Sequence, residues 1–278
     1  MTIIKNKIAL ITVIEGNFNN INFDKNKIRL YELEALKCFK AWRKNAGILK
    51  NIDIYCICVT NNQPSKKTIQ KIKNLGVNYI HEYNSISKTF NNGFWNKPLG
   101  CSILENKLNY EYFIHIDLDM YILKELKKDI YCNSCLIYDK YDSLQERKFK
   151  DKSLIPYNTC YMTSIKNDMI FTKWFNILQE INNKESFNLK NYYLDITEDK
   201  YEEAAFDILS YFTNTLIPNS GYIKQITNIM FGETYTPLSM MESINKISFH
   251  HYHIYAKPSK EKYDYKKYEK EISNYRGH

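Results

Sequence analysis

The first 80 residues alternate between two apolar patterns, and this alternation constrains the fold more than any other feature. Continuous apolar runs rich in β-branched residues predict buried strands over Ile8–Ile14, Ile52–Val59 and Val77–Ile80. Apolar residues at helical spacing predict helices over Arg29–Lys44 and Ser65–Asn74. Strands separated by helices pair in parallel through right-handed crossovers, so the sequence predicts an α/β domain with a Rossmann-like sheet.

Further helices and strands are predicted along the rest of the chain. The apolar patterns predict helices over Asn96–Leu108, Lys166–Ile181 and Tyr201–Phe212, and strands over Tyr112–Ile116 and Ile247–Tyr255. No long Pro/Gly/Ser-rich linker separates these elements. We therefore expect one domain over residues 1–258 and a basic, Tyr-rich tail over residues 259–278.

Two carboxylates, Asp117 and Asp119, follow the apolar segment Tyr112–Ile116. Alternate residues of a strand share a face, so we expect both side chains to project the same way. Two acids at the end of a buried strand are costly unless a cation offsets their charge, and this pair would suit a divalent cation that holds a phosphate. The alternative is a strand that ends in solvated acids. His115 is predicted on the same face as Asp117, either behind that carboxylate or as an ordinary core histidine.

The turn after Ile14 and the acids after Ile116 both follow predicted parallel strands. Ligands of such sheets bind at the carboxyl ends of the strands. The sequence therefore predicts a ligand site at this edge of the sheet.

Three of the six histidines gather near the end of the predicted domain, at His250, His251 and His253. Neutral imidazole is a common ligand of transition metals. Two carboxylates and one histidine form a mixed hard and borderline set, which suits Mn²⁺ better than zinc. The pattern alone leaves open which histidine binds a metal, and whether the cluster is incidental.

The net charge indicates which classes of binding partner to expect, and the cysteine content indicates the cellular compartment. The net charge of +8 favours anionic partners, either phosphorylated ligands or a membrane surface. Only 4 of the 39 basic residues are arginines and no nucleic-acid motif is present, so we expect no nucleic-acid partner. With 7 cysteines and no cleavable signal peptide, we expect a cytoplasmic protein. Cys132 and Cys135 form the one CxxC pair and are interpreted as core thiols.

The segment His251–Pro258 resembles the closing motif of retaining GT-A glycosyltransferases, in particular glycosyltransferase family 8, which contains glycogenin and bacterial lipopolysaccharide α-galactosyltransferases. The motif is a histidine, an aromatic residue and a Lys-Pro pair that begins six positions after the histidine; Tyr252 and Lys257 occupy these places. The resemblance implies that His251 completes a metal site with Asp117 and Asp119. It also implies that Lys257 binds the diphosphate.

Three more segments resemble the same family in the same order. They are Ile116–Met120, which resembles its Leu-Asp-x-Asp motif, Tyr157–Met162, which resembles its Phe-Asn-(Thr/Ala)-Gly-Val-Met segment, and Glu202–Asp207, which resembles Asp-Gln-Ala-Ala-Phe-Asn. The resemblance implies that Asn158 lines the sugar site and that Glu202 and Glu203 face the anomeric carbon and the sugar hydroxyls. The alternatives are a polar turn residue for Asn158 and, for both glutamates, a solvated helix start that complements the helix dipole.

The N-terminal turn lies where these folds hold the uridine. This implies a nucleotide-binding role for a small group of residues near the end of the first strand: Thr12, Val13, Glu15 and Asn17. Asp117 would divide its role between the metal and the ribose or sugar of the donor.

The resemblance implies a GT-A fold with a mixed sheet and a retaining, Mn²⁺- or Mg²⁺-dependent hexosyltransferase in polysaccharide or glycan biosynthesis. The donor would be a nucleotide sugar, UDP-hexose, and the acceptor a glycan, a glycolipid or a protein. The tail interleaves lysines with tyrosines, which favours peripheral contact with the inner face of a membrane or, alternatively, a solvated helix.

Several positions depart from the family pattern and leave a second function open. Cys160 and Ile254 replace glycines, Glu203 replaces a glutamine, and Ser259 replaces a tryptophan. These changes are compatible with a non-catalytic protein that binds sugar nucleotides. A third candidate, a sugar-nucleotide nucleotidyltransferase, would need a Gly-rich basic loop after its first strand, and Ile14–Phe18 is not such a loop.

Overall fold

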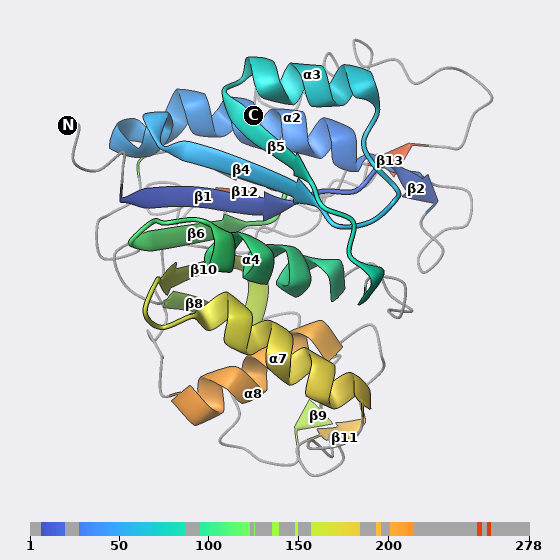
Figure 1. Ribbon diagram of the computed structural model, residues 1–278, viewed down its shortest axis with the longest axis vertical. Coiled ribbons are helices and arrows are strands. Elements are labelled where there is room, and N and C mark those ends of the chain that lie inside the picture. Colours follow the sequence, from blue (N-terminus) through green and yellow to red (C-terminus); the bar gives the residue numbers. More distant parts are fainter. Residues whose placement is uncertain are drawn as a thin grey trace, which may run out of the picture.

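A six-stranded mixed sheet with helices on both faces forms the centre of the computed structural model (Figure 1). The model describes residues 7–19, 28–86, 95–122, 125, 135–138, 148–149, 157–183, 193–195, 201–213, 249–251 and 255–256. The strand order is β5-β4-β1-β6-β10-β8, in which the first four strands are parallel and the last two are antiparallel to their neighbours. The strands are β1 (Ile8–Val13), β4 (Asp53–Cys58), β5 (Val77–His81), β6 (Tyr112–Ile116), β8 (Cys135–Tyr138) and β10 (Tyr157–Ile165). The predicted α/β class with a mixed sheet is confirmed.

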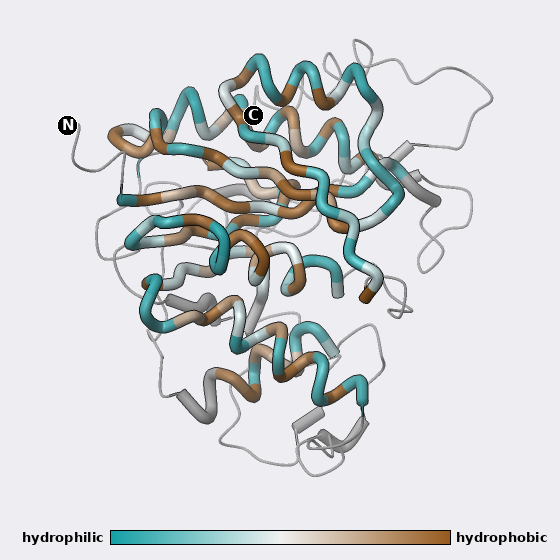
Figure 2. Tube along the Cα trace, viewed as in Figure 1, coloured by the Kyte–Doolittle hydropathy of each residue, from teal (hydrophilic) through white to brown (hydrophobic). Residues whose placement is uncertain are grey.

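Alternate residues of the strands supply two apolar cores, one on each face of the sheet. Leu10 belongs to the core that helices α2 and α3 cover, and Ile11 belongs to the core that α4, α7 and α8 cover. Apolar residues accordingly follow the strands and the inner faces of the helices (Figure 2). The helices are α2 (Tyr31–Asn45), the short 3-10 helix η1 (Gly47–Asn51), α3 (Lys66–Asn74), α4 (Asn96–Lys107), α7 (Ile170–Asn183) and α8 (Tyr201–Thr213).

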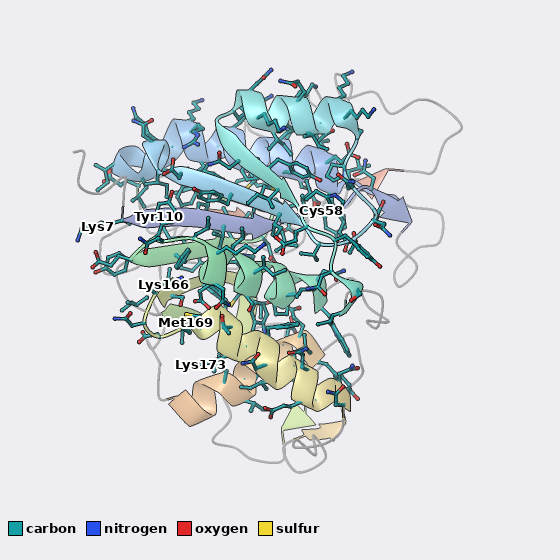
Figure 3. The ribbon with its side chains drawn as sticks, viewed as in Figure 1. Lys7, Cys58, Tyr110, Lys166, Met169 and Lys173 are labelled. Carbon is teal, nitrogen blue, oxygen red and sulfur yellow. The ribbon has the colours of Figure 1, made fainter. Side chains whose placement is uncertain are left out.

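Helix α7 begins later than its apolar pattern predicts. The segment from Lys166 to Asp168 forms a turn, and Met169 adopts a left-handed φ of 51°. The Lys166 ammonium donates hydrogen bonds to the backbone carbonyls of Leu108, at 2.9 Å, and Glu105. Figure 3 labels Lys166 and Met169 at this turn. Because Lys166 stabilises the carboxyl end of α4 in this way, it is held out of the helix that follows.

In the region of the predicted last strand, Ile247–Tyr255, the structure describes two short strands, which belong to separate small sheets. The first pairs antiparallel with a strand just beyond the Asp117 region, and the second joins two strands from the N-terminal part of the chain. The smaller sheets consist of β12 (Phe249–His251) with β7 (Met120–Ile122), of β13 (Tyr255–Ala256) with β3 (Ile28–Arg29) and β2 (Phe18–Asn19), and of β11 (Tyr193–Asp195) with β9 (Lys148–Phe149).

The described cysteines are buried, and none of them is disulfide-bonded. They are Cys38, Cys56, Cys58, Cys101 and Cys160. Of the CxxC pair, Cys132 lies outside the described residues and the backbone of Cys135 begins β8. Within the described ranges, no helix has the length and apolar character needed to cross a bilayer.

Gly100 sets how closely α4 approaches the sheet. A Cβ atom there would lie 2.6 Å from Cγ2 of Val13 and 3.0 Å from Cγ2 of Ile57. Both neighbours are β-branched residues of the sheet region with few alternative rotamers. The glycine therefore lets α4 lie against the carboxyl ends of β1 and β4.

We expect Gly100→Ala to lower the free energy of unfolding by about 1–3 kcal/mol, because the added methyl group overpacks this contact. Chemical denaturation measures the change. Asn106→Ala, at an exposed position of the same helix, is the control and should change stability by less than about 1 kcal/mol. A gain of about 1 kcal/mol in Gly100→Ala, as helix propensity alone would give, would contradict the close contact.

Candidate functional site

Some of the predicted site residues lie just beyond the carboxyl ends of β1 and β6. The two strands are parallel neighbours with Ile11 opposite His115, so the turn after β1 and the acids after β6 lie at the same edge. The first turn of α4 reaches this edge too, since Asn96 Nδ2 donates a 2.6 Å hydrogen bond to Oε1 of Glu15. The expected edge of the sheet therefore carries polar groups from three segments.

Asp117 and Asp119 lie in a turn rather than on a strand. β6 ends at Ile116, and the backbone N–H of Met120 donates to the carbonyl of Asp117 at 3.0 Å. The N–H of Asp117 donates to the carbonyl of Cys160 on β10 at 2.8 Å. The prediction that the two acids lie on a strand is thus wrong, because the hydrogen bond from Met120 to Asp117 closes a turn directly after β6. Asp119 is 2% exposed, whereas the side chain of Asp117 is 24% exposed.

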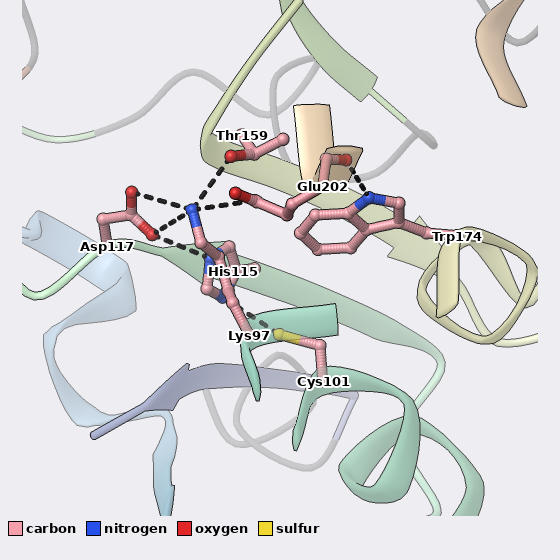
Figure 4. A network of polar contacts seen from close by, with 7 residues as sticks. All are labelled: Lys97, Cys101, His115, Asp117, Thr159, Trp174 and Glu202. Atoms are coloured by element: carbon pink, nitrogen blue, oxygen red, sulfur yellow. Dashed lines mark hydrogen bonds and ion pairs between the residues drawn. The ribbon is translucent and has the colours of Figure 1, made fainter. Parts of the chain in front are cut away.

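The ammonium group of Lys97 joins the end of β6 to the start of α8. Nζ lies 3.1 Å from both carboxylate oxygens of Asp117 and 3.1 Å from Oε1 of Glu202. It also donates a 2.9 Å hydrogen bond to the hydroxyl of Thr159 on β10 (Figure 4). One buried cation therefore holds three segments that are far apart in the sequence.

The charges of this cluster stabilise one another. Burial lowers the pKa of Lys97, but Asp117 and Glu202 outweigh burial and leave the pKa above its usual range. Burial raises the pKa of Asp117, yet Lys97 and a hydrogen bond from His115 bring it below its usual value. For Glu202, burial prevails over Lys97, so that its pKa is raised. The cluster thus combines a protonated lysine with an ionised Asp117.

Sequence reasoning did not find Lys97 or Thr159. Lys97 lies in the first turn of α4, where the helix dipole disfavours a cation. Such a lysine needs acidic partners, and this is the signal that could have found it. Thr159 adjoins Asn158, whose backbone lies in β10 and whose side chain is outside the described residues.

Glu202 and Glu203, in the first turn of α8, differ in how far they are exposed to solvent. Glu202 is 3% exposed, and its carbonyl accepts a 2.9 Å hydrogen bond from Nε1 of Trp174. A solvated helix start is therefore excluded for Glu202. Glu203 is half-buried. Nearby, Tyr201 stacks on Trp95, which precedes α4, with ring centroids 5.8 Å apart.

Glu15 follows β1 in a largely buried position. Burial raises its pKa to about 7, although the hydrogen bond from Asn96 acts in the opposite direction. A carboxyl group with this pKa is present in both protonation states near neutral pH. It can thus donate or accept a hydrogen bond there.

Thr12, Val13 and Asn17, which were also predicted to bind the nucleotide, lie in or near β1 and contact other parts of the fold. Thr12 is fully buried within β1. Val13 packs against Gly100 of α4. The amide oxygen of Asn17 accepts a 3.1 Å hydrogen bond from the N–H of Glu32 in the first turn of α2.

The backbone brings the histidine motif next to the acids. In the pairing of β12 with β7, His251 lies opposite Met120 and His250 opposite Tyr121. His251 is therefore a cross-strand neighbour of the residue that follows Asp119. The histidine side chains, His253 and Lys257 lie outside the described residues, and the described residues contain no group of three His, Cys, Asp or Glu side chains able to hold a metal. A nearly buried Asp119 beside a histidine-bearing strand fits a divalent cation by the chemistry of its donors.

No protein-family model matches the sequence, and no curated protein sequence matches it. Solved structures do match. An active-site mutant of LgtC has 11% sequence identity and a TM-score of 0.50, with 96% of this chain and 95% of that chain covered. This likeness over almost the whole chain shows that the protein has the fold of LgtC, as expected for the GT-A class.

Two further structures match with lower TM-scores. The galactosyltransferase LgtC in complex with donor and acceptor sugar analogs has 13% identity and a TM-score of 0.48, with 88% and 86% of the two chains covered. The glycosyltransferase GlyE of Streptococcus pneumoniae TIGR4 has 11% identity and a TM-score of 0.44. The match covers 76% of this chain and spans 44% of the length of GlyE.

We expect Lys97→Met to lower the free energy of unfolding by about 3–5 kcal/mol, because it leaves the buried Glu202 and the partly buried Asp117 without their cation. In the double variant with Glu202→Gln, the loss should be smaller than the sum of the two single losses, since one carboxylate is then neutral. Chemical denaturation of all four proteins gives the coupling energy.

The control is Lys107→Met, which breaks an exposed ion pair with Glu82 and should cost less than about 1 kcal/mol. Strict additivity of Lys97→Met and Glu202→Gln would show that the two side chains are not coupled.

Proposed function

We propose that this protein is a metal-dependent glycosyltransferase that moves a hexose from UDP-hexose to a glycan, glycolipid or protein acceptor with retention of anomeric configuration. The observation that carries the proposal is the buried Lys97 between Asp117 and Glu202 at the carboxyl ends of the strands. The fold shared with LgtC supports it. The donor nucleotide, the retention and the metal follow from the family resemblance and remain part of the proposal.

The first chemical task is to offset the negative charge on a departing diphosphate. Asp119 and His251, with Asp117, would hold Mn²⁺ or Mg²⁺. When bound, this cation supplies positive charge next to the leaving group. Lys257 adds a second positive charge, placed before the reaction begins.

The second task is to stabilise positive charge on the sugar. In our proposal the Glu203 carboxylate faces the anomeric carbon and stabilises an oxocarbenium-like transition state, while Asn158 contacts the sugar. Glu202 would hold the neighbouring Glu203 in place, because the Glu202 carboxylate contacts Lys97 and its carbonyl contacts Trp174. The start of α8 is thereby fixed next to the site.

The nucleoside would lie against the turn after β1. Glu15 offers a hydrogen-bonding group whose pKa of about 7 lets it donate or accept. Thr12, Val13 and Asn17 would then shape this end of the site through packing and backbone contacts.

If the proposal is right, Asp119→Ala and His251→Ala each abolish Mn²⁺-dependent hydrolysis of UDP-sugars while the fold survives, because each removes a metal ligand. Release of UDP measures hydrolysis, and circular dichroism measures folding. His81→Ala, which changes an exposed histidine of β5, is the matched control and should keep full activity.

Full activity of either site variant in EDTA would contradict the proposal. A wild-type protein that binds UDP-sugar with Mn²⁺ but never hydrolyses it would instead indicate the non-catalytic alternative.

For the tail we propose peripheral attachment to the inner face of a membrane, which rests on its lysine and tyrosine content. Full-length protein should then co-sediment with phosphatidylglycerol vesicles, and a chain truncated after Pro258 should stay in the supernatant. Equal sedimentation of the two chains would contradict membrane contact through the tail.

A further inference from the structure

A histidine lies directly behind the Asp117 carboxylate. His115 is 1% exposed, and its Nε2 lies 3.3 Å from Oδ1 of Asp117. Its Nδ1 lies 3.3 Å from Sγ of Cys101 on α4. The ring of Phe171 packs edge-on against the imidazole, with ring centroids 6.2 Å apart. Cys101, His115 and Asp117 thus form a continuous chain of polar contacts from α4 into the site (Figure 4).

The direction of these hydrogen bonds follows from what each group can do. An ionised carboxylate only accepts, so the contact with Asp117 requires the proton of the imidazole on Nε2. In the neutral ring Nδ1 is then an acceptor, and the thiol of Cys101 can donate to it. Burial raises the pKa of this thiol, although the charge of Lys97 opposes the shift, so the donor proton is retained. The ring also has a hydrogen bond with the backbone of Ile11, but the opposite tautomer would place the lone pair of Nε2 against a carboxylate.

Helix α4 consequently contacts Asp117 by two routes. Lys97 and Cys101 are four residues apart and lie on the same face of the helix. Lys97 contacts both oxygens of Asp117 directly, and Cys101 acts through His115 on Oδ1. A terminal carboxylate torsion is otherwise broad, so two contacts from different directions select one orientation.

We propose that His115 is a positioning residue that fixes the orientation of the Asp117 carboxylate, and that Cys101 fixes the tautomer of His115. This inference rests on the proposed function for its kinetic consequence, because a carboxylate held in place before the donor binds needs no reorganisation during the reaction.

The arrangement of protons can be tested without any ligand. Two-bond ¹H–¹⁵N correlation spectra of the wild-type protein should show His115 as the neutral tautomer with its proton on Nε2. A proton on Nδ1 would overturn the proposal whatever reaction the protein catalyses.

The kinetic test compares two pairs of variants in Mn²⁺-dependent UDP-sugar hydrolysis. His115→Leu removes the hydrogen bond and should lower kcat/KM by about 10- to 100-fold, as losses of such supporting contacts do in metal sites. His115→Gln places an amide N–H near the position of Nε2 and should recover most of that loss. Likewise Cys101→Ser keeps a donor and should stay near wild type, whereas Cys101→Val should not.

Phe171→Leu is the control for packing, since it changes the apolar contact of His115 and no polar one. It should lower the melting temperature and leave kcat/KM unchanged. Equal losses in His115→Leu and His115→Gln, or wild-type kinetics in both, would overturn the positioning role. A wild-type protein without UDP-sugar binding or hydrolysis would overturn the proposed function, and the NMR result would still decide the proton arrangement.

Discussion

The site depends on one buried ammonium group. Lys97 lies where the dipole of α4 is unfavourable to it, and burial adds a desolvation penalty. Asp117 and Glu202 offset both effects, and the lysine in turn acts to lower the pKa of each acid. The end of β6, the N-terminal part of β10 and the first turn of α8 are therefore mutually dependent. Their common partner is supplied by α4.

Asp117 and Asp119 differ in their contacts, and this difference suits them to different roles. Both oxygens of Asp117 contact Lys97, and one of them also contacts His115. A carboxylate shared in this way has less charge to offer a divalent cation. Asp119 is more deeply buried and lies next to the residue that pairs with His251. Asp119 is thus the stronger candidate for the metal, and Asp117 is better suited to orient the donor.

The sequence predicted the parts of the fold that depend on periodicity. The β-branched runs and helical spacings identified the parallel strands and their helices, and the rule for parallel sheets predicted that the turn after β1 and the acids after β6 lie at one edge, as they do. The turn from Asp117 to Met120 was missed because the segment has no glycine or proline. The hydrogen bond that the Asp117 N–H donates to Cys160 was missed because the apolar pattern did not mark β10 as a strand. Lys97 was missed since it is one of many lysines. What distinguishes it is the close packing of α4 at Gly100, which is a tertiary property.

Strand β10 explains how the site tolerates a departure from the family pattern. Cys160 stands where the resembled segment has glycine, yet its contact with Asp117 is made by the backbone carbonyl. The Cys160 side chain is 2% exposed and belongs to the apolar core on the α2 side of the sheet. The preceding residue, Thr159, contacts Lys97 on the other side. The Cys160 side chain thus fills the core on the α2 side of the sheet, while the Thr159 hydroxyl keeps its contact with Lys97 in the site.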